Sequence, residues 1–163
     1  APDEGEASYE ENAARKARAL YSRLAAEAGE ARVVADDSGL EIEALGGEPG
    51  VLTARFGGEH LSWAQRRHFV LERMRGIPAE RRGARFVCAV HYIGADGDER
   101  SSVGSVAGTI AEEERGEGGF SFDPIFYYPP FGRTFAQLRE EEKDRISHRA
   151  LAVNGVFGVR ADA

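Results

Sequence analysis

The spacing of apolar residues along the chain predicts three helices. A capping box at residues 8–11 opens an apolar stripe with helical spacing that ends at Gly29, which predicts a helix of about five turns. A second capping box at residues 62–65 predicts another helix, which Gly76 ends. A third stripe predicts one last helix over residues 139–154. Each stripe needs an apolar surface to pack against.

Strands predicted between the helices supply that surface. The apolar run at residues 32–35 and the alternation at residues 40–44 predict two strands, with the acidic turn Asp36-Asp37-Ser38-Gly39 between them. Residues 84–93 and 100–107, joined by an Asp/Gly turn, predict an antiparallel hairpin. The chain shows no internal repeat or linker, so we expect one α/β domain with a central mixed β-sheet flanked by helices.

Composition narrows the class of protein. With 163 residues, 42% of them hydrophobic, the chain can bury one core, and its net charge of −7 argues against a nucleic acid polymer as main partner. The two arginine doublets, Arg66-Arg67 and Arg81-Arg82, are interpreted as solvated faces. No apolar stretch could span a bilayer and no secretory leader is seen, so we expect a cytoplasmic protein without a membrane partner. Cys88, the single cysteine, lies in an apolar run and is predicted to be core.

The scarcity of lysine is the first indication of a ligand site. Among its 21 basic residues the chain has only two lysines, Lys16 and Lys143. A compact ammonium group suits phosphate oxygens met end-on, although compositional drift would leave the same count. Asn12 and Lys16 share one helix face. Glu11 stands at the third position of the helix, where a glutamate also has a purely structural use.

The two adjacent aspartates are a candidate cation site. Carboxylates at the end of a strand suit a hard divalent cation, although an ordinary Asx turn explains the same tetrapeptide. Successive strand side chains point to opposite faces, so Asp36 and Asp37 cannot both contact one ligand unless the turn begins there. One of the two is therefore expected to be structural.

A glycine-rich loop at residues 116–131 is the second candidate. Its segment Gly118–Pro124 combines glycines that let backbone approach a ligand, aromatic rings that could stack on a base and a carboxylate that could read polar edges. A loop that packs Phe120 or Phe122 into the core would look the same. Lys143 and the run Ile146–Arg149 fall on the one predicted last helix, where a solvated edge is the ordinary interpretation.

Five segments in a fixed order carry a resemblance to a known family. The segments are Tyr9–Ala17, Ala35–Leu40, Ala44–Val51, Gly119–Phe126 and Glu142–Arg149. In order and approximate spacing they resemble the non-canonical purine nucleoside triphosphate pyrophosphatases, also called inosine/xanthosine triphosphate pyrophosphatases or HAM1/RdgB-like proteins. The resemblance covers nearly the whole chain and implies one such domain over residues 1–163, with that family's fold.

The resemblance implies an enzyme that hydrolyses ITP, dITP and XTP to the monophosphate and pyrophosphate, with Mg²⁺ as cofactor and a homodimer as the assembly. It places the proton acceptor on Asp37, Mg²⁺ ligands on Asp37 and Glu11, and a phosphate contact on Lys16. His148 and Arg149 would lie near the 6-keto edge of the purine. The expected substrate-binding residues are Asn12, Lys16, Ser38, Phe120, Ser121, Phe122, Asp123, Lys143, His148 and Arg149.

The chain also departs from the family pattern. Relatives usually have Gly-Phe-Gly-Tyr-Asp where this chain has Gly-Phe-Ser-Phe-Asp, so Ser121 and Phe122 replace a flexible glycine and a phenol. The family opens with a strand and a phosphate-binding loop, and nothing upstream of Tyr9 resembles them. We therefore expect that this N-terminal part is absent, either by truncation or in a partner-completed form. The rival hypotheses are a magnesium-nucleotide-binding module without catalysis, and an enzyme for another modified nucleoside triphosphate.

Overall fold

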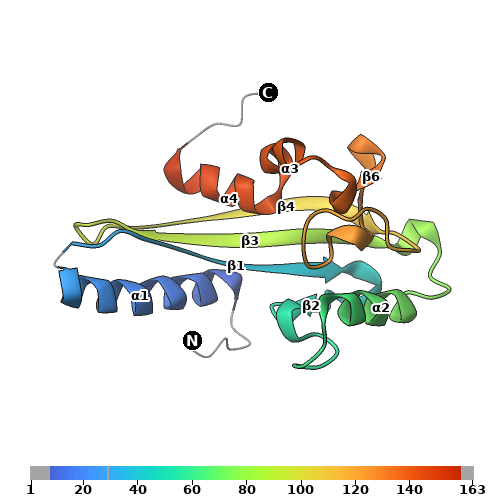
Figure 1. Cartoon of the computed structure of the whole chain (residues 1–163), viewed down its shortest axis with the longest axis horizontal. Helices are drawn as coiled ribbons and strands as arrows, with labels where there is room; N and C mark the ends of the chain where they lie inside the picture. The colour runs from blue at the N-terminus through green and yellow to red at the C-terminus, as the bar shows by residue number, and fades with distance from the viewer. Residues whose placement is uncertain (1–7, 29, 159–163) are drawn as a thin grey trace. The chain divides into compact units, whose positions relative to one another are not determined.

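The structure is a computed structural model that describes residues 8–28 and 30–158 (Figure 1). The described chain contains both helices and strands, as the predicted α/β class requires. Among the described residues, no helix has the length and the apolar composition needed to cross a membrane. The helices and strands are α1 (Tyr9–Ala28), β1 (Val33–Ile42), β2 (Pro49–Gly50), α2 (Trp63–Arg73), β3 (Gly83–Ile93), β4 (Glu99–Ile110), β5 (Phe126–Tyr128), β6 (Arg133–Thr134), α3 (Glu140–Ile146) and α4 (His148–Phe157).

The six strands form one sheet in the order β2-β1-β3-β4-β5-β6. The pairs β1–β2, β4–β5 and β5–β6 are antiparallel, with Leu40 opposite Gly50 in the first. The hairpin predicted from the Asp/Gly turn is confirmed: Gly94 N donates to Asp98 O at 2.8 Å between β3 and β4. The predicted fold class, a sheet with flanking helices, is thus confirmed.

The described residues form two compact units, to which β1, β3 and β4 each contribute. The first contains the chain up to Ser38, residues 87–105 and the chain from Ser147, and the second contains residues 39–86 and 106–146. Whether the family's single domain spans residues 1–163 stays a prediction.

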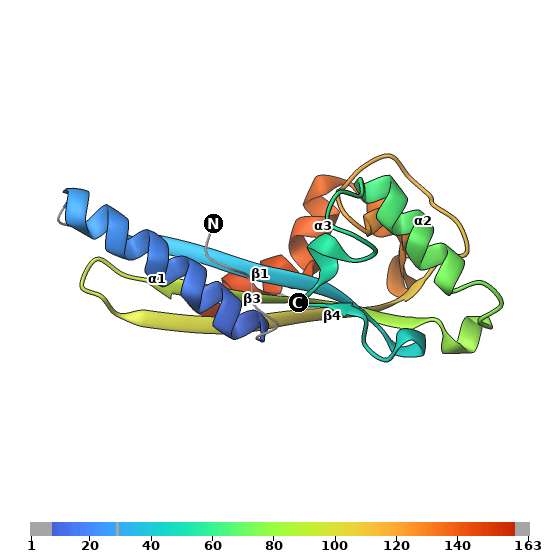
Figure 2. The same cartoon turned by 90° about the horizontal axis from the view of Figure 1, so that it is seen from below.

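In the first unit, α1 and α4 cover opposite faces of the strands (Figures 1 and 2). Ala17 of α1 packs with Val33 and Ile93. Ala152 and Val156 of α4 pack with a cluster on the other face that includes Cys88. The two clusters lie on opposite faces of the strands because alternate residues of a strand point to opposite sides.

The second unit is built around aromatic rings and buried arginines, one of which is Arg82. The Phe126 ring lies 4.4 Å from that of Phe86 and 4.9 Å from that of Phe135. The guanidinium of Arg82 donates to the carbonyls of Met74, Ile77, Ile110 and Ala111, so it joins the end of α2 to the end of β4. The solvated face predicted for Arg82 is therefore wrong, since only 6% of the residue is exposed.

The acidic turn predicted between two strands is also wrong. Residues 33–42 form the single strand β1, and Asp36-Asp37-Ser38-Gly39 continues through it in extended conformation. Val33 and Asp37 are buried on one phase of the alternation, and Leu40 and Ile42 are buried on the other, so both faces of the strand are covered in part. The packing of both strand faces therefore overrides the turn propensity of Asp, Ser and Gly.

The last helix predicted over residues 139–154 is two helices. Ser147 has the extended dihedral angles φ −66° and ψ 150°, and its Oγ accepts a hydrogen bond from Ala150 N at 3.1 Å. A serine in this geometry is an N-cap, so a new helix begins after it. The break separates Lys143 on α3, in the second unit, from His148 and Arg149 on α4, in the first.

The Ser147 cap is expected to stabilise the fold measurably. Ser147→Ala removes the acceptor of the Ala150 amide at a buried position and should lower the free energy of unfolding by about 1 kcal/mol. Urea unfolding followed by circular dichroism measures the change. Ser22→Ala, at an exposed position of α1, is the matched control and should shift stability by less than about 0.5 kcal/mol. Equal effects from both substitutions would contradict the cap.

Candidate active site

The first group of site residues gathers around the Asp37 carboxylate in the first unit. Asn12 Nδ2 donates to Asp37 Oδ2 at 3.1 Å, and Lys16 Nζ lies 2.7 Å from Asp37 Oδ1. Asn12 and Lys16 are one turn apart on α1, so the shared face predicted from their spacing is found. Asp37 is 8% exposed and Asn12 2%, and burying a carboxylate without such hydrogen-bond donors would be costly.

The neighbours of Asp37 also fix its orientation. Arg15 Nη2 donates to Asn12 Oδ1 at 3.0 Å, so the Asn12 amide must turn its NH₂ group toward Asp37. Lys16 Nζ additionally donates to the Asp36 carbonyl at 3.4 Å, which ties the helix to the strand backbone. Each oxygen of the Asp37 carboxylate accepts one of these bonds and has a further lone pair, so the group can still accept from water or ligate a cation.

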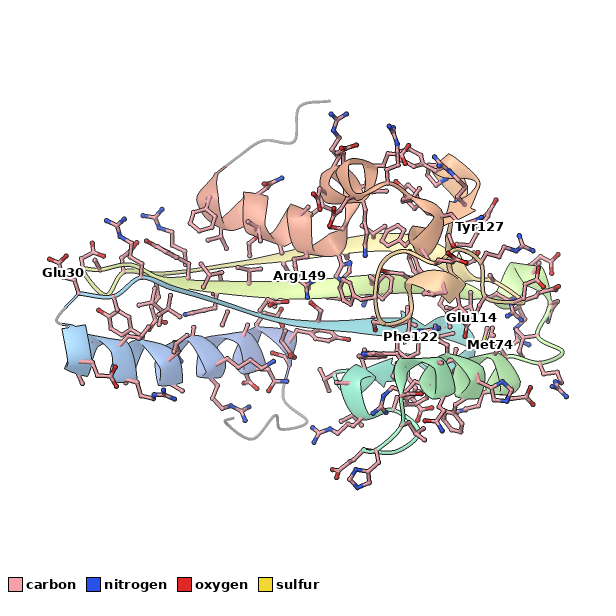
Figure 3. All side chains as sticks on the ribbon, viewed as in Figure 1. Glu30, Met74, Glu114, Phe122, Tyr127 and Arg149 are labelled. Carbon is pink, nitrogen blue, oxygen red and sulfur yellow. The ribbon has the colours of Figure 1, made fainter. Side chains whose placement is uncertain are left out.

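Asp36 makes a separate group on the opposite face of β1. Its Oδ2 accepts from Arg149 Nε at 3.1 Å, from Arg149 Nη2 at 3.0 Å and from Ser38 Oγ at 3.2 Å (Figure 3). The expectation that adjacent strand carboxylates take different partners therefore agrees with the geometry. Asp36 positions two predicted substrate contacts, Ser38 and Arg149, whereas Asp37 stands with Asn12 and Lys16.

The start of α4 is packed closely on β4 next to this group. A side chain at Gly104 would overlap with the His148 carbonyl, so the glycine lets the helix begin here. His148 is 4% exposed and Arg149 is half-buried, which makes Arg149 the more accessible of the two. Their predicted contacts with the purine stay predictions.

The Glu11 backbone takes part in the start of the helix. Glu11 is exposed, and its backbone N donates to Ser8 Oγ at 3.2 Å at the beginning of α1. It lines an open hollow of about 780 Å³ together with Arg15, Arg18 and His91. Within residues 8–28 and 30–158, no group of three or more His, Cys, Asp or Glu side chains is arranged to hold a metal ion. A magnesium contact of Glu11 stays a prediction.

The second group of site residues lies in the second unit, around Asp123. The Asp123 carboxylate is 1% exposed, accepts from Phe120 N at 2.7 Å and forms an ion pair with Lys143 Nζ. Lys143 Nζ also lies 4.4 Å from the centre of the Phe120 ring. Phe120 is 50% exposed, so the group presents an aromatic face beside an ammonium. A side chain at Gly119 would overlap with Asp123 Oδ2, which explains the glycine there.

The start of α3 holds Lys143 in place. The Arg139 backbone N donates to Glu142 Oε2 at 2.9 Å, and Arg133 Nη2 donates to Glu142 Oε1 at 3.2 Å. These hydrogen bonds, led by that of the Arg139 backbone, lower the pKa of Glu142 to about 2. Glu142 therefore stays ionised at neutral pH and anchors the helix turn that carries Lys143.

Ser121 and Phe122 differ in how well their residue types suit their positions. Ser121 has φ +57°, the one positive φ of a non-glycine residue in the described part of the chain, and the resemblance places glycine there in relatives. Phe122 is fully buried, with its ring 5.6 Å from that of Trp63 in an edge-on contact (Figure 3). The ring therefore packs in the core, where a phenol would need a partner, and a substrate contact of Phe122 stays a prediction.

Sequence reasoning missed the role of the basic doublet on α2. Arg66 is 4% exposed and donates to the carbonyls of Phe56 and Gly58 at 2.8 and 2.6 Å. Arg67 donates to the carbonyl of Ser121 at 2.9 Å. The solvated face predicted for this doublet is thus wrong. No signal in the sequence distinguishes these arginines from surface cations, because their partners are backbone carbonyls distant along the chain.

Comparison with known proteins places these groups in a family context. A sequence model of the Ham1 family matches residues 1–158. A dITP/XTP pyrophosphatase of Thermus thermophilus is 45% identical over 161 residues, which are 99% of this chain and 75% of that protein. That of Geobacillus kaustophilus is 46% identical over 94% of this chain and 74% of its own length. The solved structure of the Staphylococcus aureus Ham1 protein has a TM-score of 0.84 and 40% identity, covering 96% of this chain and 78% of that one.

One expectation about the N-terminus does not hold against these comparisons. The absence of the family's N-terminal strand and phosphate-binding loop is not borne out, since the family match begins at residue 1. Residues 1–7 lie outside the described residues.

Cys88 is expected to be chemically inert although it lies beside Asp36. Its Sγ is 3.8 Å from Asp36 Oδ2, and burial is the main cause that raises the pKa of the thiol from 9.0 to about 11. Since the thiolate is the reactive form, labelling by Ellman's reagent at pH 8 should be at least about 100-fold slower in the folded protein than in guanidinium chloride. Cys88→Ser gives the background rate. Fast labelling of the folded protein would contradict this environment.

Proposed function

Because this chain belongs to the Ham1 family, we propose that it hydrolyses deaminated purine nucleoside triphosphates, namely dITP, XTP and ITP, to the monophosphate and pyrophosphate. The observation that carries the proposal is the buried Asp37 carboxylate, which Asn12 and Lys16 hold from one helix face. Curated relatives about 45% identical over nearly the whole chain are named for this activity. The enzyme would remove deaminated purines from the nucleotide pool.

Asp37 is the proposed proton acceptor. Attack of water on the α-phosphorus needs a base within hydrogen-bond reach, and a carboxylate in fixed orientation with a further lone pair can serve. Asn12 fixes that orientation through Nδ2, and Lys16 contributes a positive charge 2.7 Å from Oδ1. The ammonium can also contact phosphate oxygens, since its three N–H donors rotate about one flexible stem and its charge attracts an anion.

Magnesium is the proposed cofactor. The available donors fit it, because Asp37 and Glu11 offer hard carboxylate oxygens and Mg²⁺ is commonly bound by one or two carboxylates together with waters and substrate phosphates. When bound, Mg²⁺ would neutralise the charge that develops on the pyrophosphate leaving group. Asp37 would ligate it, and Glu11 at the exposed end of α1 is the second proposed ligand.

The Asp123 group has the chemistry to bind a purine base. The exposed Phe120 ring offers a stacking surface, and Lys143 holds Asp123 beside it.

For the 6-keto group, Arg149 and His148 are the proposed donors, and the Asp36 carboxylate orients the Arg149 guanidinium. Donors aimed at a 6-keto oxygen disfavour adenine, which carries an amino group there.

The assembly and the location are further proposals. The resemblance implies a homodimer, and the role in the nucleotide pool implies the cytoplasm. Light scattering on a size-exclusion column would decide the first.

The direct test is pyrophosphate release from dITP and XTP, with dGTP and dATP as controls, with Mg²⁺ and again with EDTA. We expect release from dITP and XTP to exceed that from dATP by about 100-fold, because donors that match the keto edge are left unpaired by adenine. The dGTP control shares the 6-keto group, so it tests whether the 2-amino group is rejected. EDTA should abolish it. Binding of ITP without any product would instead support the non-catalytic module, and turnover of another base would support the other substrate class.

Adjacent aspartates provide a matched pair of variants. Asp37→Asn removes the proposed base and metal ligand and should lower kcat by about 1,000-fold or more. Asp36→Asn, one residue away on the opposite face, loosens Arg149 and Ser38 and should chiefly raise KM. Circular dichroism checks that both variants fold. Near-native turnover by Asp37→Asn would remove Asp37 from the mechanism.

A further inference from the structure

We propose that Arg67 is a positioning residue that sets the conformation of the base-binding loop, residues 111–122 between β4 and Asp123, and thereby the selectivity for the base. This inference rests on the proposed function for its kinetic part. It deepens that proposal with a residue that has no assigned contact with the base or the reacting atoms. The Arg67 clamp denotes Arg67, Glu114 and Ser121.

The clamp joins the two ends of the loop to α2. Arg67 Nη1 donates to the Ser121 carbonyl at 2.9 Å, and Arg67 Nε lies 3.0 Å from Glu114 Oε1. Glu114 stands where the loop leaves β4, and Ser121 stands next to the exposed Phe120 ring. One guanidinium group therefore fixes the entry of the loop and its far end relative to the same helix. The Arg67 side chain is 15% exposed and Ser121 is buried, so water competes weakly for the bond to the Ser121 carbonyl. The Glu114 side chain is 39% exposed, so the ion pair is the weaker of the two contacts.

Ser121, whose carbonyl Arg67 binds, also has a strained backbone. Ser121 is in the left-handed backbone region at φ +57°, which is costly for a residue with a Cβ and persists only where the surroundings enforce it. The hydrogen bond from Arg67 reaches the carbonyl of that same residue. Without it, the loop would relax toward a conformation with negative φ.

Relaxation of Ser121 would move the groups on both sides of it. Phe120 precedes it with the ring that Lys143 approaches to 4.4 Å, and the Phe120 amide donates to Asp123. Phe122 follows it with the ring that packs on Trp63, itself on α2. The stacking surface and the Asp123 carboxylate thus depend on a conformation that Arg67 secures from a distance. A small misplacement of binding groups is enough to lower selectivity strongly.

The kinetic test compares Arg67→Met with Arg75→Met, an exposed arginine just after α2 that pairs with Glu72. Methionine keeps an apolar stem but removes every donor. For Arg67→Met we expect KM for dITP to rise about 10-fold or more, with a smaller change in kcat and a lower ratio of dITP to dATP turnover. Arg75→Met should behave like the unmodified protein. Glu114→Gln, which keeps the guanidinium in place, should shift KM in the same direction by less.

The second readout does not depend on activity. Trp63 is the only tryptophan, and its ring contacts Phe122, so its quenching by acrylamide reports on the loop. Quenching should increase in Arg67→Met and stay unchanged in Arg75→Met. The inference is overturned if KM and quenching are unchanged, or if dITP and dATP turnover fall by the same factor along with Tm, which would indicate a merely structural role. Should the unmodified protein release no pyrophosphate, the proposed function fails, and unchanged Trp63 quenching in Arg67→Met would still refute the clamp separately.

Discussion

The alternation of side chains along β1 is the constraint on which the candidate active site depends. Asp36 and Asp37 are neighbours in sequence, yet a continuous strand sends them to opposite faces of the sheet. On one face Asp37 meets α1, and on the other Asp36 meets α4. A turn at this point would have put both carboxylates on one side and left one helix without its partner. The strand therefore gives two similar residues different partners.

Each face then completes its group with a helix whose start is fixed by capping. The amide of Glu11 is bonded to Ser8 at the beginning of α1, which sets the rotation that brings Asn12 and Lys16 over Asp37. Ser147 does the same for α4 and brings Arg149 to Asp36. Local hydrogen bonds of modest energy thus determine the direction of charged side chains, because helix rotation is set within the first turn.

How far the sequence predicts this arrangement depends on the range of the interaction. The shared face of Asn12 and Lys16 follows from helical spacing, and the hairpin follows from its Asp/Gly turn, so local rules suffice for both. Local rules do not predict the strand through Asp36 and Asp37, because tertiary burial overrides turn propensity there. They also do not predict the helix break at Ser147, because an N-cap residue can lie inside an apolar stripe. The burial of Phe122 depends on its contact with Trp63, which is distant in sequence.

The two kinds of cation are used for different tasks, which accounts for the rarity of lysine in the chain. Both lysines pair with buried carboxylates, Lys16 with Asp37 and Lys143 with Asp123, where a compact ammonium can also turn toward a ligand. The buried arginines on and after α2 bind backbone carbonyls instead, because a planar fork with five donors can reach several at once. Arg82 alone reaches four. Arginine therefore fixes the backbone of the second unit, whereas each lysine pairs with one buried carboxylate.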